Sequence, residues 1–356
     1  MRFAAITLSL AALLGLAIVT GGAAAAWAAL AFVTLFAAGM DRIAALAAPD
    51  APAGAEFPAG TGLSALLGLV HVPLLYGGAL ALAARPVSAD ALALFVALAL
   101  FLGQVSNSNA HELIHRGDRR LRALGVAVYV TLLFGHHVSA HRRVHHVWAA
   151  TDRDPNSARP GEGFWHFAPR AWWGSYLAGR RAETTLRRGR GVHPYRVYAA
   201  GSVASLACVW AIGGGTALAW YVGLCVYAQL QLLLSDYVQH YGLRRARRAD
   251  GSWAPVGPAH SWNAPHGFTS GLMLNAPRHS DHHAHPGRAY PGLRLDREAM
   301  PMLPHALPVM AVIALVPPLW RRVMDRRVRA WSAPHASGTG GPGRFPVAPG
   351  SATIGP

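Results

Sequence analysis

The sequence predicts an all-α integral membrane protein with about six transmembrane helices and a histidine-rich part on the cytoplasmic side. Of its 356 residues, 53% are hydrophobic and only 13% are charged. The apolar residues stand in long unbroken runs, and about 20 such residues in a helix cross a bilayer. Eighteen of the 19 histidines follow residue 105, so they lie outside these runs or at their ends.

The first 106 residues, 1–106, are predicted to form four N-terminal transmembrane helices, at 3–20, 22–40, 62–83 and 88–106. The first two runs adjoin across "TGG" (20–22), a pattern typical of a helical hairpin. Arg2 and the small residues of "AAAAWA" also imitate a cleaved signal peptide, which is the alternative interpretation of this stretch.

Two further transmembrane helices are predicted at 197–217 and 219–236, which together form the segment 197–236. Two weaker apolar runs, 121–138 and 306–320, are not expected to cross the membrane. If the first crossed, it would carry the histidines on either side of it to opposite faces, so we expect an interfacial or re-entrant helix. The second contains "VPPLW", and paired prolines disfavour a straight spanning helix.

The positive charge of the chain sets its expected orientation. Fifteen arginines fall between 106 and 196, and arginine-rich flanks stay on the cytoplasmic side of a bacterial inner membrane. The segments 107–196 and 237–330 and the loop 41–61 are therefore predicted to be cytoplasmic. The net charge of +16 then serves topology and attraction to anionic lipid, and nucleic-acid binding is disfavoured because no binding module accompanies the arginines. The Gly/Pro-rich residues 331–356 predict a disordered tail.

Three short histidine clusters have the spacing of metal ligands. Two of them place histidines four residues apart, hence on one helical face, and the third places them three apart. Two clusters end in a doublet, whose second ring points about a quarter-turn away. One helical face can bind one metal and the adjacent histidine can reach another, so the doublets predict two metal ions. The members are His111 and His115 of "HELIH", His141, His145 and His146 of "HRRVHH", and His279, His282 and His283 of "HSDHH".

The surplus of imidazoles over carboxylates narrows the kind of metal site. Imidazole suits iron, copper, zinc and nickel. A zinc protease with HExxH needs only three protein ligands, and a soluble di-iron bundle uses mainly glutamates. Two histidine-rich sites at a membrane surface favour a di-iron centre that activates oxygen. Solitary histidines are expected to be ordinary surface or core residues: His71, His166, His193, His260, His266, His285, His305 and His335.

The order and spacing of these clusters resemble the membrane di-iron superfamily of fatty acid desaturases and hydroxylases. Finer blocks resemble the bacterial alkane 1-monooxygenase family, from about residue 105 to 330. They are "NAHELIHR", "DRDPNSAR", "DYVQHYGL", "HSWN", "RHSDHHAHPGRAYPGLR" and "VPPLWRRVMDRRV". The hydrophobic first hundred residues agree with that family only in their span pattern.

The resemblance implies two non-haem iron ions held by the eight clustered histidines and by a ninth, His240 of "HYG". Glu112, Asp236 and Asp281 are then candidate catalytic carboxylates beside the ligands. Asp236 and His240 stand one helical turn apart, so the carboxylate is expected to accept a hydrogen bond from the second ring N–H of that imidazole. The chain departs from the family in two places: Gln239 replaces a glutamate, and "SA" precedes His141 where an acidic residue is common.

The implied activity is hydroxylation of the terminal carbon of an alkane or similar hydrocarbon with O2. The substrate would reach the metal site through a tunnel between the spans. Trp27, Phe32 and Phe36 are candidate gate residues, although a packing or lipid-facing role is favoured for them. Cys208 and Cys225 are the only cysteines, so this sequence has no CxxC pair for an iron–sulfur centre. Electrons are expected from a separate rubredoxin or ferredoxin with an NAD(P)H reductase. An arginine-rich face is expected to attract that carrier, formed by Arg142, Arg143, Arg180, Arg181, Arg187 and Arg188.

Two other functions stay open at this point. One is a desaturase or an aromatic-methyl (xylene-type) hydroxylase of the same superfamily. The other is a non-catalytic metal transporter with a histidine-rich mouth. A transporter is expected to carry polar residues at mid-membrane depth, and these spans carry almost none.

Overall fold

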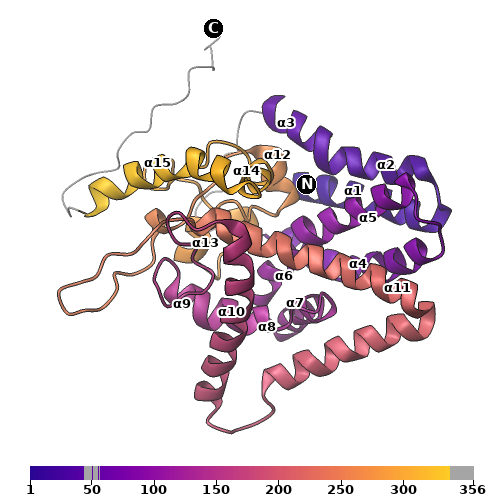
Figure 1. Ribbon diagram of the computed structural model, residues 1–356, viewed down its shortest axis with the longest axis horizontal. Coiled ribbons are helices and arrows are strands. Elements are labelled where there is room, and N and C mark those ends of the chain that lie inside the picture. The colour runs from indigo at the N-terminus through magenta and orange to yellow at the C-terminus, as the bar shows by residue number, and fades with distance from the viewer. Residues whose placement is uncertain (44–49, 51–54, 56, 337–356) are drawn as a thin grey trace.

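The computed structural model describes residues 1–43, 50, 55 and 57–336, and the regular elements within them are helices (Figure 1). The only β pairing in this part of the chain consists of isolated bridges. The predicted all-α class is therefore confirmed.

The chain begins with a helical hairpin. Helix α1 (Arg2–Thr20) is followed by α2 (Ala23–Ala31), and Gly21 makes the turn with a φ of 73°. Helix α2 continues through one π-helical turn, η1 (Phe32–Phe36), into α3 (Ala37–Ile43). Most of the predicted loop 41–61 lies outside the described residues.

The next two long helices lead toward the first histidine cluster. Helix α4 spans Pro58–Ala83. Helix α5 (Ala89–Phe101) begins where the Ser88 hydroxyl accepts a hydrogen bond from the Ala91 N–H, and it continues through η2 (Leu102–Ser106) into α6 (Asn107–Ile114). This continuous helix extends eight residues past the predicted boundary at 106 and carries His111 on its last turns, as the cluster spacing predicted.

Helix α11 (Pro194–His240) contains both of the remaining predicted spans. Its 47 residues fold back as two arms (Figure 1), because Gly214 interrupts the helix with φ 67° and ψ −164°. Five helices of the described chain, with α11 counted once, are long and apolar enough to cross a membrane. The protein is thus a multi-pass membrane protein, while six crossings and the side that faces the cytoplasm stay predictions.

Shorter helices make up the remainder. Between the spans lie α7 (Arg119–Thr131), α8 (His136–Ala140), the π turn η3 (His141–His145), α9 (His146–Trp148) and α10 (Phe164–Arg187). After α11 come η4 (Pro258–His260), α12 (Gly267–Leu272), α13 (His279–Ala284), η5 (Tyr290–Gly292), α14 (Leu307–Ala314) and α15 (Pro317–Ala336).

Two sequence predictions change here, and a third agrees with the structure. The run 121–138 is not one helix, since α7 ends at Thr131 and the chain turns through Leu133 at φ 57°. The run 306–320 breaks between α14 and α15, in keeping with its prolines. Residues 331–336 of the predicted disordered tail belong to α15, because "RRVRAW" continues the buried stripe of Val328 and Trp331; residues 337–356 lie outside the described chain.

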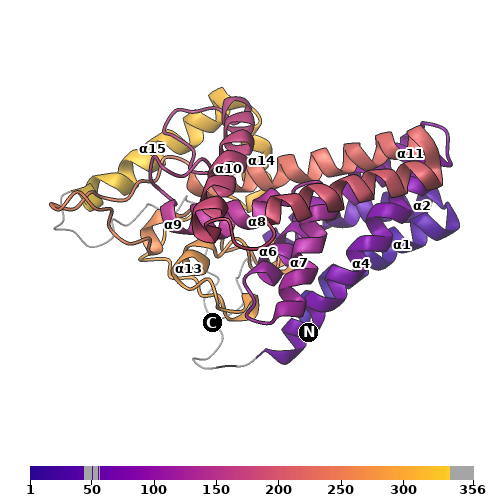
Figure 2. The same cartoon turned by 90° about the horizontal axis from the view of Figure 1, so that it is seen from below.

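The apolar helices gather on one side of the molecule and the histidine-bearing segments on the other (Figures 1 and 2). Buried polar side chains join the helices between these regions. The Asn107 Nδ2 donates to the Ala228 carbonyl at 2.8 Å, and the Asn109 Nδ2 donates to the Ser64 carbonyl at 2.9 Å. In a low-dielectric interior these two interhelical hydrogen bonds help to fix how α6 lies against α4 and α11.

The break in α11 gives a first testable prediction. Gly214 has a backbone conformation that is essentially restricted to glycine, so Gly214→Ala is expected to cost about 1–3 kcal/mol of stability. Gly215 has no positive φ, and a methyl group added there meets nothing within 4 Å, which makes Gly215→Ala the matched control. Thermal unfolding of both variants in detergent measures the difference. Equal melting temperatures would show that the turn between the arms tolerates a side chain.

Candidate metal centre

Nine buried or half-buried histidines converge in two adjacent groups. Within each group the possible ligand nitrogens all lie within 4.8 Å of one another. We call the groups site A and site B. Site A contains His111, His115, His141, His146 and His282; site B contains His145, His240, His279 and His283. The two groups contain all nine sequence-predicted histidines, and no further histidine of the described chain.

The imidazoles in each site face one another with their Nε2 atoms. In site A, His146 Nε2 lies 2.9 Å from His141 Nε2 and 3.0 Å from His282 Nε2. In site B, His279 Nε2 lies 3.0 Å from His240 Nε2 and 3.1 Å from His283 Nε2. Nitrogen–metal bonds of about 2.0–2.1 Å at right angles place neighbouring ligand nitrogens about 3 Å apart.

The protonation of these rings also fits a metal centre. Burial lowers the pKa of His141, His146, His279, His282 and His283 well below the usual value, and neighbouring histidines lower it further. Each neutral ring has an unshared electron pair on one nitrogen, and the pairs of facing rings repel one another. A cation between the rings would bind these pairs and remove the repulsion. The Nε2 atoms of His111, His115 and His145 are buried and have no hydrogen-bond partner. The residues present therefore fit two metal ions.

The "HRRVHH" cluster divides between the sites in a way that the α-helical spacing did not predict. The prediction grouped His141 with His145 on one face, but the structure pairs His141 with His146 in site A and places His145 in site B. The cause is the π-helical turn η3, which spans His141–His145. A π turn has i→i+5 hydrogen bonds, so residues five apart come to share a face.

A similar correction applies to "HSDHH" on α13. Its three-residue step does not define a shared site: His279 belongs with His283 in site B, and His282 belongs to site A. His279 and His283 are four apart and lie on one face of the helix. The predicted division of each doublet between two sites is what the structure shows, although the partners differ.

The block "HSWN" holds the segments of site B in place. Asn263 Nδ2 donates to Ser280 Oγ at 2.7 Å, and its Oδ1 accepts from the Ser280 N–H, so it fixes the first turn of α13. The Trp262 backbone N–H donates to the Gln239 carbonyl at 2.7 Å, and its indole N–H donates to the Tyr241 carbonyl at 2.9 Å. These contacts join the end of α11, which carries His240, to the start of α13.

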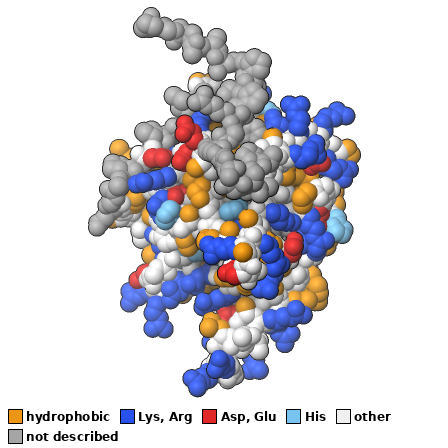
Figure 3. Space-filling model, turned by 90° about the vertical axis from the view of Figure 1, so that its left-hand side faces the viewer, with side chains coloured by type: hydrophobic (Ala, Val, Ile, Leu, Met, Phe, Trp, Pro, Cys, Tyr) orange, Lys and Arg blue, Asp and Glu red, His pale blue; other side chains and the backbone are white. Residues whose placement is uncertain are grey.

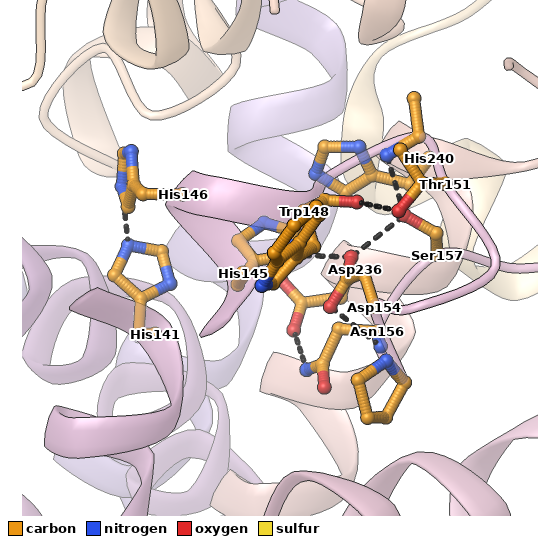
Figure 4. A network of polar contacts seen from close by, with 12 residues as sticks. His141, His145, His146, Trp148, Thr151, Asp154, Asn156, Ser157, Asp236 and His240 are labelled. Atoms are coloured by element: carbon orange, nitrogen blue, oxygen red, sulfur yellow. Dashed lines mark hydrogen bonds and ion pairs between the residues drawn. The ribbon is translucent and has the colours of Figure 1, made fainter. Parts of the chain in front are cut away.

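The sequence prediction missed Asp154, the acid that contacts a site histidine. His145 Nδ1 lies 2.8 Å from Asp154 Oδ2, and Figure 4 shows this pair within a network that includes Asn156, Ser157 and Asp236. Burial lowers the pKa of His145, but Asp154 outweighs it and the pKa is raised. Burial likewise raises the pKa of Asp154, but His145 and the Ser157 hydroxyl lower it overall. Asp154 therefore orients His145 so that its Nε2 points into site B.

The three predicted carboxylates have other partners. Glu112 pairs with Arg116 and accepts from the Tyr290 N–H. Asp281 pairs with Arg288 at 2.5 Å and with the half-exposed His285 at 3.0 Å. Both carboxylates are buried and paired with arginines, and neither belongs to the two groups of possible metal ligands.

Asp236 does not pair with His240 as the helical spacing suggested. Its Oδ2 accepts from Asn156 Nδ2 at 2.6 Å, and the residue forms part of the cavity wall described below. The Asp236 carboxylate is thus turned toward Asn156 rather than toward the His240 ring, although the two residues are one helical turn apart.

The contacts of Gln239 explain why a glutamine suits this position. Its Oε1 accepts from Ser235 Oγ at 2.9 Å, while its Nε2 donates to the Ala276 carbonyl at 3.2 Å. A glutamate cannot make the second bond, so the neutral amide suits both contacts and links α11 to the segment before α13.

A cavity of about 690 Å³ leads from the metal sites into the apolar part of the molecule. His111 and His141 of site A and His279 of site B line one end. Aliphatic residues of α14 and of η1 line it further out, including Val312, which is 66% exposed on the apolar surface. Gln104, Gln231 and Ser235 add polar groups to its wall.

The proposed gate residues lie outside this lining. The Trp27 indole donates to Asp90 at 2.7 Å, and the rings of Phe32 and Phe36 pack against Phe268 with centroids 5.9 Å and 5.4 Å away. Their helix does contribute to the wall, through Val33 and Thr34. The contacts of Trp27, Phe32 and Phe36 agree with the packing role that the sequence favoured for them.

The solitary histidines mostly have ordinary polar partners. His71 contacts Thr131 at 3.0 Å, His166 contacts Glu162 at 3.0 Å, and His193 contacts Thr184 at 3.2 Å. His136 and His137, which no cluster spacing singled out, are buried among aromatic rings beside site A.

The sequence of the chain is similar to those of several known proteins. A sequence model of the family described as fatty acid desaturase matches residues 89–314. The chain is 33% identical to alkane 1-monooxygenase 1 of Pseudomonas aeruginosa over 77% of this chain and 75% of the relative. It is 34% identical to the alkane 1-monooxygenase of Acinetobacter baylyi over 65% of this chain and 59% of the relative. It is 26% identical to the xylene/toluene monooxygenase hydroxylase component of Pseudomonas putida over 64% and 62% of the two chains.

The contact between His145 and Asp154 gives the second prediction. Asp154→Asn keeps the shape of the side chain but removes the charge that orients His145, so metal affinity is expected to fall about 10–100-fold. Asp152→Asn is the control, because that side chain is 79% exposed and lies 3.9 Å from Arg244. The metal retained by each variant after titration with a chelator measures the effect. Equal retention by the two variants would assign Asp154 to loop structure alone.

Proposed function

This chain belongs to the alkane 1-monooxygenase family within the fatty acid desaturase superfamily, and we propose that it hydroxylates the terminal carbon of alkanes or similar hydrocarbons with O2. One observation carries the proposal: the apolar cavity ends at histidines of both metal sites. A hydrocarbon in that cavity would place one end of its chain beside both sites.

We propose two non-haem iron ions as the cofactor, one in each site. The supporting observation is the donor set, which consists of neutral imidazoles with no carboxylate among them in the described chain. Bound there, iron would supply the redox chemistry that activates dioxygen. His111, His115, His141, His146 and His282 would hold one ion; His145, His240, His279 and His283 would hold the other.

The protein's own contribution is to position the substrate and to exclude water. An apolar wall holds the reacting carbon near the sites, and exclusion of water limits loss of the oxidant to side reactions. Exposed apolar residues of α14 at the outer part of the cavity suit a substrate that arrives from the lipid. Asp154, through His145, keeps site B in one geometry.

Electrons are proposed to come from a separate rubredoxin or ferredoxin and its NAD(P)H reductase, on the cytoplasmic side of a bacterial inner membrane. Cys208 and Cys225 lie apart in the sequence and are both free thiols. Such carriers are acidic, and arginines outnumber acidic residues on the face in Figure 3. Of the predicted arginine-rich face, Arg143 and Arg187 contact Glu183 at 3.8 Å and 3.3 Å, while Arg180, Arg181 and Arg188 are exposed.

A second candidate function is hydroxylation of an aromatic methyl group. The similarity to the xylene/toluene monooxygenase component favours it over desaturation among the remaining alternatives.

The adjacent histidines of α13 permit a test of the two-iron proposal. The wild-type protein is expected to bind two iron ions per chain, one for each histidine group. His282→Ala is expected to empty site A and His283→Ala site B, each with loss of hydroxylation, since α13 lies outside the candidate spans and insertion stays intact. His193→Ala is the control. Iron analysis of the purified variants measures this, and one zinc with no iron in the wild type would overturn the proposal.

Substrate oxidation tests the activity itself. Cells that express the protein with a rubredoxin system are expected to convert octane or hexadecane to the 1-alkanol, and the His283→Ala variant is not. Xylene is offered in parallel. Formation of benzylic alcohols without 1-alkanols would select the second candidate, and alkenes as the main product would select a desaturase.

A further inference from the structure

A continuous series of aromatic side chains runs from site A to the molecular surface. His141 of site A lies 5.1 Å from His137, measured between ring centroids, and His137 stacks on Phe134 at 5.2 Å. Phe134 lies 4.8 Å from His136, which lies 4.9 Å from Trp172. We call this series, with Tyr129, Trp173 and Tyr176, the aromatic chain.

The two ends of the aromatic chain carry oxidisable rings. At the inner end, Tyr129 is fully buried, lines the cavity and lies 5.0 Å from His137. At the outer end, Trp172 is nearly parallel to Trp173, at 6.2 Å and 10°, and to Tyr176, at 6.2 Å and 2°. Trp173 is 57% exposed. Indole and phenol are the side-chain rings most easily oxidised by one electron, so the chain joins the site of oxygen chemistry to solvent.

We propose that the aromatic chain removes oxidising equivalents from the metal centre when O2 has been activated but no hydrocarbon is bound. This inference rests on the proposed monooxygenase function. Trp172 is the half-buried relay, and Trp173 is the exit to the surface. A one-electron oxidised Trp172 keeps its indole hydrogen bond to Gln229 Oε1, which is 2.8 Å long, and Gln229 is itself held by the Leu132 carbonyl at 2.9 Å. That fixed carbonyl dipole favours the positive charge on the ring.

The electrons and protons balance as a complete reduction of O2 to water. Two electrons from the carrier and two from the aromatic chain, with four protons, reduce O2 to two water molecules. Each electron from the chain leaves an indole without breaking a bond. The electron hole moves from Trp172 to Trp173, and a soluble thiol then reduces Trp173 by donating one electron. Two thiols thereby become one disulfide and release two protons.

A structural role for these rings would not need this continuity. Interfacial tryptophans are common at membrane surfaces, and Trp173 alone fits that role. The buried links His136, Phe134 and His137 do not face lipid, since each is at most 6% exposed. Through successive ring contacts they connect Trp172 to His141 of site A.

The experiment uses the reduced, iron-loaded protein mixed with O2 without hydrocarbon. A tryptophan radical is expected by electron paramagnetic resonance after rapid freezing, and peptide mass analysis is expected to find oxygen added to Trp173. Trp172→Phe keeps the ring packing but should abolish both signals and should inactivate several-fold faster per O2 consumed. Its hydroxylation rate with octane present is expected to be unchanged.

Trp210→Phe is the matched control, because Trp210 is 62% exposed on α11 and lies outside the aromatic chain. A wild-type protein that forms 1-octanol but shows no radical, or a Trp172→Phe variant that inactivates like Trp210→Phe, would overturn the proposal. A wild-type protein that forms no octanol and consumes no O2 would instead contradict the proposed function. Trp173→Phe gives an independent check, since an exposed ring can be replaced without a core defect; there the radical should persist on Trp172.

Discussion

The structure depends on holding nine imidazoles with their ligand nitrogens toward two points. Neutral rings packed this way repel through their unshared pairs, so in the metal-free protein the arrangement opposes folding rather than driving it. The surrounding contacts supply the missing constraint. Asn107 and Asn109 donate hydrogen bonds from one helix to another, while Asn263 and Trp262 join the segments that carry His240 and His279. Contacts elsewhere in the protein thus hold the histidines in an arrangement that the metal-free rings themselves do not favour.

Three π-helical turns lie along the wall between lipid and metal. Phe32–Phe36, Leu102–Ser106 and His141–His145 each widen one turn of a helix that lines the cavity. A π turn usually arises where one residue is added to an α-helix, which rotates everything after it by part of a turn. At η3 that rotation is what groups His141 with His146 rather than with His145. The π turn η2 likewise rotates the helix that follows it, and so determines the direction in which His111 points.

The sequence predicts the helices well because lipid leaves the backbone no alternative to helix, so long apolar runs are unambiguous. The nine histidines are also predictable, eight of them from spacing and His240 only from family resemblance. Their pairing is not, because tertiary packing decides where a π turn forms. The contact of Asp154 with His145 was not predictable for another reason. Asp154 lies in a loop nine residues after His145, and no helical or strand periodicity relates the two residues. His136 and His137 lack a metal-ligand step and are meaningful only through the rings around them.

The helix Ala89–Ile114 extends without interruption from the apolar side of the molecule to His111. A helix responds to its surroundings by tilting as one rod, and hydrophobic mismatch between a span and its bilayer is relieved in part by tilt. His111 would move with such a tilt, whereas His282 on the short helix α13 would not. The thickness of the surrounding bilayer is therefore expected to change the position of His111 relative to His282 in site A. The lipids chosen to reconstitute the protein would then affect how site A holds a metal ion.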